Sequence, residues 1–270
     1  METNRNIQTE TGIVVPTISR ERHQLLLSSL EKDYGILPLQ IVEAASFSLA
    51  MVVRFALGLS AERSRICVLA NESLAGAVAL TAARHIVING GDAVVLVTCG
   101  AEEKNSQFLE GKSLARSALN TLETLGVPFQ SWDATKSAAL VQEVFQECHN
   151  VICGLFDYRT EQEPFEQTVV EALNEVSTPI HCVTCPLGVE PDSGISLGEP
   201  LFASSTLSLG LPLHAALESP DNLGRHYLCD ISIPGALRET FGLEAPPLFP
   251  EQPVCKLLLH TPEEDSEEST

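Results

Sequence analysis

The chain has 270 residues, of which 44% are hydrophobic, and it carries 16 Lys and Arg against 36 Asp and Glu, a formal charge of −20. A chain of this size and apolar content can bury a substantial core and fold as a globular protein. Its negative charge repels a phosphate backbone, which excludes a broad electrostatic surface for nucleic acid.

The N-terminal decapeptide METNRNIQTE is polar and lacks the basic and then apolar layout of a signal peptide, so we expect a cytoplasmic protein. The apolar stretch 44–53 lies between Glu43 and Arg54. It is far shorter than the roughly 18–20 residues that cross a bilayer. We therefore expect no membrane span.

The eight cysteines of a chain without an export signal are typical of reduced thiols packed as small apolar side chains. Cys182 and Cys185 form a C-x-x-C motif, a spacing that serves zinc sites and redox pairs. Structural zinc needs four ligands, and the sequence offers no second pair of this kind. The motif also lies in an apolar strand that ends at Pro186, so we interpret both cysteines as core and strand-end residues.

After a polar arm (1–14), helical spacing of apolar residues predicts a helix from Ser19 to Lys32 that ends near Gly35, and a second from Ile41 to Ala56 that stops at Gly58. From there strands and helices alternate. The expected strands are 65–70, 93–98, a short one around Phe129, 150–156 and 179–184, and the expected helices are 73–88, 112–125, 136–148 and 164–176.

This alternation predicts parallel βαβ units, and the uninterrupted apolar strands predict a sheet that is covered on both faces. The segments 205–211 and 225–234 are strand-like and are expected as additions at the edge of this α/β sheet. The final residues, 261–270, are acidic and nearly devoid of apolar side chains, which is typical of a disordered tail. Ligands of an open parallel sheet bind beyond the carboxyl ends of its strands.

Several segments between residues 15 and 260 resemble the YjeF N-terminal domain family, whose enzymes are NAD(P)H-hydrate epimerases, and in particular the corresponding domain of the eukaryotic enhancer-of-mRNA-decapping scaffold. The order and spacing of these segments carry the resemblance. It implies one three-layer α/β/α Rossmann-like domain over 15–260, with a mostly parallel sheet and N-terminal helices. The matching segments are VPTISRERHQLLLSSLEKDYGI (15–36), AARHI (82–86), EPF (163–165), LSLGLPLHAAL (207–217) and GRHYLCDISIP (224–234).

The phosphate-binding loop is the first departure from this family. The epimerases carry G-N-N-G-G-D-G after the first strand, whereas this chain has SLAGAVA (73–79), in which only Gly76 remains. A nest of backbone amides needs residues that tolerate positive φ, and the replacements tolerate it poorly. The turn Asn71–Ser73 is expected to cap a helix N-terminus, whose positive end still favours an anion. The motif NGGD (89–92) follows the helix and is interpreted as a helix C-cap and turn.

The family's metal-binding and catalytic residues are the second departure. By the resemblance, the aspartate that holds potassium falls on Cys153 and the catalytic aspartate on Thr184. Thiolate is a poor ligand for a hard cation, so the potassium site is expected to be lost. A threonine hydroxyl cannot exchange protons in the useful pH range, so we expect most of the chemistry to be lost as well. The family's serine and lysine fall on Leu187 and Leu213.

Other acids near the expected ligand face could have taken over, although exposed loop carboxylates are common. They are Glu72, Asp157, Glu190 and Asp192. His181 is expected to make a structural hydrogen bond within a strand, and no nucleophile elbow of the G-x-S-x-G type is present. A small ligand, which would be an adenine or nicotinamide nucleotide, is expected at a site formed by Asn71, Glu72, Ser73, Gly76, Asp157 and Thr184.

These observations favour a catalytically degenerate domain that acts as a ligand-binding or dimerisation module. The resemblance implies a homodimer through the N-terminal helices, which span Ser19 to Leu59 and carry more apolar residues than one face can bury. Two alternatives remain: an NAD(P)H-hydrate epimerase with a rearranged site, and a sensor that binds an adenine nucleotide.

Overall fold

The computed structural model describes residues 5–56, 65–98, 109–132, 138–156, 164–243 and 247–261. The helices are α1 (Arg20–Tyr34), α2 (Pro38–Met51) with a π-helical extension (Val52–Ala56), α3 (Leu74–Ile88), α4 (Leu109–Thr124), α5 (Ala138–Gln146), α6 (Pro164–Asn174), α7 (Ala215–Glu218), α8 (Pro220–Leu223) and α9 (Gly235–Thr240). The strands are β1 (Asn6–Thr9), β2 (Val14–Val15), β3 (Arg65–Ala70), β4 (Asp92–Thr98), β5 (Phe129–Trp132), β6 (Asn150–Gly154), β7 (Ile180–Val183), β8 (Ser205–Leu209), β9 (Arg225–Cys229) and β10 (Val254–His260).

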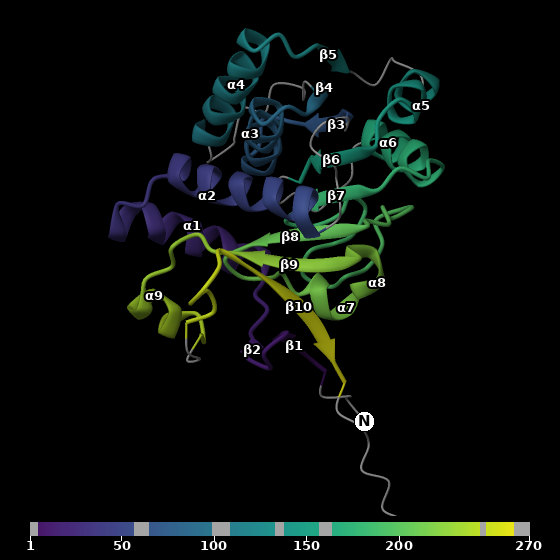
Figure 1. Ribbon diagram of the computed structural model, residues 1–270. Helices are drawn as coiled ribbons and strands as arrows, with labels where there is room; N and C mark the ends of the chain where they lie inside the picture. The colour runs from purple at the N-terminus through teal and green to yellow at the C-terminus, as the bar shows by residue number, and fades with distance from the viewer. Residues whose placement is uncertain are drawn as a thin grey trace, which may run out of the picture.

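The strands form one ten-stranded sheet in the order β2-β1-β10-β9-β8-β7-β6-β3-β4-β5. The seven strands from β9 to β5 run parallel, and β10, β1 and β2 add to them in antiparallel fashion. The expected α/β fold with a mostly parallel sheet is therefore confirmed. Figure 1 shows α1 to α4 on one side of the sheet and α5 and α6 on the other.

The sheet separates two apolar cores, as the uninterrupted apolar strands predict. In β3, Ile66, Val68 and Ala70 face the core under α1 to α4, whereas Cys67 and Leu69 face the core under α5 and α6. Side chains that alternate between two buried layers explain why this strand has no polar face.

Two helix starts and two helix ends agree with the sequence interpretation. Ser19 caps α1 by accepting a hydrogen bond from the Arg22 amide, and Gly35 ends that helix at φ 67°. Ser73 caps α3 in the same way. The NGGD motif forms the turn after α3, where Gly90 has φ 89° and Gly91 N donates to Ile86 O. This confirms that the motif is a helix end and not a phosphate loop.

Two expectations about the ends of the sheet are wrong. β8 and β9 are interior parallel strands and not edge additions, because β10 and β1 pair beyond them. The segment expected as a polar arm contributes β1, whose Ile7 is 2% exposed, and the edge strand β2. Both errors share a cause: β1 and β10 are distant in sequence and recognise each other only in the folded chain.

Pro38–Phe55, formed by α2 and its extension, has the length and hydropathy of a membrane-crossing helix, and half of it is buried. The core helix of a globular domain passes the same test. Here Ile41, Val42, Ala45 and Leu49 lie in the core beside α3.

Three buried histidines tie elements of the fold together. His23 Nε2 donates to the Leu209 carbonyl at 2.8 Å. His181 Nε2 lies 2.7 Å from Asn150 Oδ1, and its Nδ1 lies 2.9 Å from Ser205 Oγ. His226 Nε2 lies 2.8 Å from Ser208 Oγ. The expected structural hydrogen bond of His181 is thus confirmed.

Burial lowers the pKa of His23, His181 and His226 to about 4 in each case. The unfolded chain protonates these rings below about pH 6.5, so it binds more protons than the folded chain between pH 6.5 and 4. We expect the free energy of unfolding to fall as the pH drops through this window, by about 1.4 kcal/mol per pH unit for each ring. Urea denaturation at a series of pH values measures it. In the variant His181→Asn the free energy of unfolding should depend less steeply on pH than in the parent chain, whereas the exposed-site variant His260→Gln should match the parent. The same slope in the parent and both variants would contradict the lowered pKa of His181.

Candidate functional site

The candidate site lies where three neighbouring parallel strands end. β3 ends at Ala70, β6 at Gly154 and β7 at Val183, and the register pairs Ala70 with Gly154 and Cys153 with Cys182. The segments that follow these strands therefore meet at one edge of the sheet, where open α/β folds bind ligands.

The turn after β3 uses its polar side chains internally. Ser73 Oγ accepts from the Gly76 amide at 3.1 Å and donates to Asn71 Oδ1 at 2.5 Å. Asn71 Nδ2 donates to the Leu155 carbonyl at 2.8 Å, which ties the turn to the end of β6. Asn71, Ser73 and Gly76, three of the expected ligand-binding residues, are thus brought together, and their hydrogen bonds stabilise the turn.

Gly76 allows the backbone of this turn to lie directly against α3. A Cβ atom on residue 76 would lie 2.0 Å from Asn71 O. Gly154 gives the end of β6 the same close approach to α3, because a Cβ atom on residue 154 would lie 2.5 Å from Ala75 O and 2.6 Å from Ala79 Cβ. The start of α3 is packed against the strand ends too closely for any added group.

Glu72 points away from this turn toward α4. Its Oε1 lies 2.7 Å from Arg116 Nη2, and the two side chains are 31% and 66% exposed. An exposed ion pair of this kind contributes little to stability. Asp157, the other acid expected beside the site, lies outside the described residues.

Cys153 does not line the crevice as a ligand. It is 3% exposed and lies in the core under α5 and α6, beside Cys182 of the neighbouring strand. A hydrogen bond with the Cys153 thiol, together with burial, raises the pKa of the Cys182 thiol well above its usual value. Burial also raises the pKa of Cys185 strongly. Both cysteines of the C-x-x-C motif are therefore neutral thiols in the core.

Thr184 has an unusual backbone. It follows β7 with φ 69° and is 3% exposed, and its amide donates to Leu207 O at 2.8 Å. Positive φ is rare for non-glycine residues and most costly for β-branched ones such as threonine, whereas Asp and Asn tolerate it. Backbone strain of this kind clusters at functional sites, and it cannot be predicted from the residue type.

The loop acids Glu190 and Asp192 hold their own loop in place. Glu190 Oε2 accepts from the Asp192 amide at 3.0 Å and from the Ser193 amide and hydroxyl at 2.6 and 2.7 Å. Asp192 Oδ1 accepts from the Arg20 amide at 2.6 Å. Burial opposes ionisation of Glu190, but the bonds from Ser193 and Asp192 and the charge of Arg20 outweigh it and lower its pKa. Glu190 is therefore an anion at neutral pH, not a proton donor.

Across the ranges that the structure describes, no three His, Cys, Asp or Glu side chains are grouped so that they could hold a metal ion. His214, for which the sequence suggests no partner, bonds Thr17 Oγ1 through Nδ1 at 2.8 Å. His85 lies 3.0 Å from Glu43, which also pairs with Arg84.

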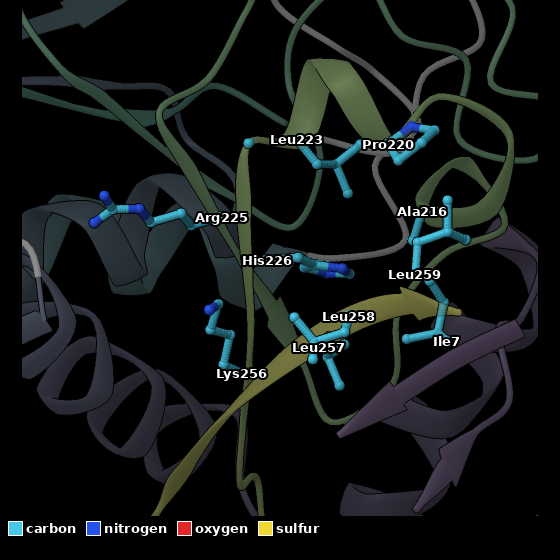
Figure 2. Close-up of a pocket in the computed structure, with 11 residues that line it drawn as sticks. Ile7, Ala216, Pro220, Leu223, Arg225, His226, Lys256, Leu257, Leu258 and Leu259 are labelled. Carbon is cyan, nitrogen blue, oxygen red and sulfur yellow. The ribbon is translucent and has the colours of Figure 1, made fainter. Parts of the chain in front are cut away.

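A pocket of about 300 Å³ lies elsewhere, between β9, β10 and the short helices α7 and α8 (Figure 2). β9 is parallel to β7, so the first residues of β9 lie at the sheet edge opposite Thr184. Sequence reasoning missed this pocket because its lining comes from three distant segments: residue 7, residues 216–226 and residues 256–259. The sequence motifs considered above contain no signal that joins these segments.

Comparison with known proteins points to one family. Residues 38–215 match the family described as YjeF-related protein N-terminus. Over 239 residues the chain is 28% identical to an NAD(P)H-hydrate epimerase of Dehalogenimonas lykanthroporepellens, covering 88% of both chains. It is 26% identical over 240 residues to the bifunctional NAD(P)H-hydrate repair enzyme Nnr of Thermofilum pendens, covering 85% of this chain.

The chain is also 24% identical over 254 residues to enhancer of mRNA-decapping protein 3 of Gallus gallus, covering 89% of this chain. It spans only 44% of the Thermofilum enzyme and 44% of the Gallus protein. Among solved structures, yeast ynu0 superposes with a TM-score of 0.74 at 22% identity, covering 90% of this chain and 100% of that one. This last likeness supports the fold alone.

The packing of α3 gives a direct test. We expect Gly76→Ala to lower the free energy of unfolding by about 1–3 kcal/mol, the usual cost of overpacking, because its Cβ would meet the Asn71 carbonyl. Gly235→Ala is the matched control, since Gly235 is also helical and nothing lies within 4 Å of its Cβ position. That control should be neutral or slightly stabilising. Equal stabilities of the two variants in urea denaturation contradict the close approach.

Proposed function

The chain belongs to the family of YjeF-related N-terminal domains, and from that premise we propose that it is a catalytically degenerate member that acts as a dimerising interaction module. The observation that carries the proposal is Thr184. By resemblance this residue occupies the family's catalytic aspartate position, and its φ of 69° is one that aspartate tolerates better than threonine. The strained backbone supports the alignment independently of sequence similarity.

The surroundings of Thr184 offer no substitute acid in the described loops. Glu190 and Asp192 bind their own loop and the start of α1, and Glu72 pairs with Arg116. General acid–base groups typically contribute about 10² to 10⁴-fold to a rate, so their loss supports a domain without turnover.

The crevice also fits a nucleotide phosphate and a potassium ion poorly. A phosphate at a helix N-terminus needs free amides, but the Gly76 amide is bonded to Ser73 Oγ and the space beside it is filled by the Asn71 backbone. The thiol of Cys153 lies in the core and is a soft ligand. The described residues of the crevice therefore fit neither group, and protein association is the binding role that we propose.

Exposed apolar side chains on α2 and its π-helical extension support self-association. They are Leu39, Phe47 and Met51 of α2 and Phe55 of the extension, and each is at least 38% exposed. Leu25 on α1 and Leu37 between the helices are also more than half exposed. Several exposed large apolar side chains on neighbouring helices are typical of an association surface. We propose a second copy of the chain as the partner. The proposed location is the cytoplasm, where the free thiols of the described cysteines persist.

The catalytic part of the proposal is tested with NAD(P)H hydrate. We expect the chain to leave the interconversion of the R and S hydrates at its spontaneous rate. A coupled assay with the dehydratase that consumes one epimer measures this, and the Dehalogenimonas epimerase serves as positive control. Acceleration by the chain would instead support the second candidate, an epimerase with a rearranged site, whose supporting observation is the match to the Dehalogenimonas epimerase over 88% of both chains.

The association part is tested by sedimentation equilibrium. We expect a dimer at micromolar concentration, and Leu39→Asp should raise its dissociation constant by roughly tenfold or more, because it places a charge in an apolar interface. The matched control is Ile195→Asp, which changes a side chain of similar exposure on the loop after β7. A monomeric parent chain refutes the dimer.

A further inference from the structure

The pocket beside β9 has a buried aliphatic floor. Ile7, Ala216, Leu223 and Leu257 line it and are each 2–3% exposed, and they come from β1, α7, α8 and β10. Its volume of about 300 Å³ is at the lower end of the range for ligand pockets. The site is therefore large enough for a small molecule and too small for a dinucleotide.

His226 is the polar group of this floor. The residue is 7% exposed and lines the pocket, and its Nε2 is paired with Ser208 Oγ at 2.8 Å. Within the described part of the chain, no hydrogen bond is formed to its other ring nitrogen, Nδ1. If the Ser208 hydroxyl donates to Nε2, the neutral ring carries its proton on Nδ1 and donates there; if the hydroxyl accepts from Nε2, Nδ1 is an acceptor. Burial lowers the pKa of His226 to about 4, so the ring is uncharged at neutral pH.

Two of the lining residues, Arg225 and Lys256, are basic, and their side chains are directed away from the floor (Figure 2). Arg225 and Lys256 neighbour His226 and Leu257, whose side chains face the pocket, and successive side chains of a strand point to opposite faces. Figure 2 shows both basic side chains directed away from Leu223, Ala216 and Ile7, with His226 between the two groups. Neither of these two side chains is thus placed to neutralise an anion on the floor (Figure 2), and the net charge of −20 repels anions as well.

We propose that this pocket binds an uncharged small molecule with an apolar body and one hydroxyl group, which forms a hydrogen bond with the imidazole of His226. The aliphatic floor supplies the affinity, and the single polar group orients the ligand. The site is separate from the crevice at Thr184 and does not depend on the function proposed for that crevice.

The location is tested with p-cresol as probe, by NMR of the chain labelled with ¹⁵N in its histidine rings. We expect p-cresol at millimolar concentration to shift the His226 ring resonances. Leu259→Trp should abolish the shift, because Leu259 lines the pocket beside Ile7 and is 37% exposed, so a larger side chain can fill the mouth without disturbing the core. The control is Val14→Trp, which enlarges an exposed side chain of the edge strand β2 that is not among the residues lining the pocket. The absence of a shift in the parent chain, or the same shift in the Leu259 variant, overturns the proposal.

The chemistry of the ligand is tested by comparing three probes of equal width. We expect p-cresol to bind roughly three- to tenfold more tightly than toluene, the worth of one hydrogen bond. The anion 4-methylbenzoate should bind more weakly than both. In the double variant Ser208→Ala/His226→Phe, which leaves neither partner unpaired, p-cresol and toluene should bind alike. Tighter binding of the benzoate, or an unchanged cresol preference in the double variant, refutes an uncharged ligand held by His226.

Discussion

The close contact of α3 with the ends of β3 and β6 is the constraint on which the rest of this structure depends. Two glycines make it possible: Gly76 in the helix, against the Asn71 carbonyl, and Gly154 in the strand, against Ala75 and Ala79. α3 is Ala-rich and ten of its residues are buried, so it lies at the centre of one face and contacts α2, α4, β3 and β6. Protein interiors are packed like crystals, and a helix this near the sheet leaves no room for an intervening ligand loop.

That packing connects the fold to the proposed loss of chemistry. The turn from Asn71 to Ser73 lies against the helix start, and its side chains complete the cap and reach the end of β6. A phosphate-binding loop must instead leave its amides open to a ligand. The same geometry that stabilises the centre of the domain therefore supports the proposed loss of catalysis at this edge of the sheet.

Much of this architecture could be predicted from the sequence, because buried parallel strands and the helices between them have strong local patterns. The run RICVLA at β3 and the Ser73 cap of α3 are of this kind. β1, β2 and β10 could not be predicted in the same way, since their pairing joins the two ends of the chain. In the site, Glu190 and Ser193 are close in sequence, but the bond from Arg20 to Asp192 spans 172 positions. The positive φ of Thr184 is set by the fold around it and has no local signal.

The pairing of β1 with β10 has a consequence for the connectivity of the domain. Asn6 lies opposite His260 in the antiparallel register, so the two outermost paired positions of the chain are direct neighbours. A short linker could covalently join these positions without altering the sheet, and new chain ends could then be opened in a surface turn such as the one at Gly126. In the native order, any domain attached before β1 and any attached after β10 would be anchored side by side at one corner of the molecule. The pairing of β1 with β10 thus brings together the points at which any preceding and any following segment would be attached.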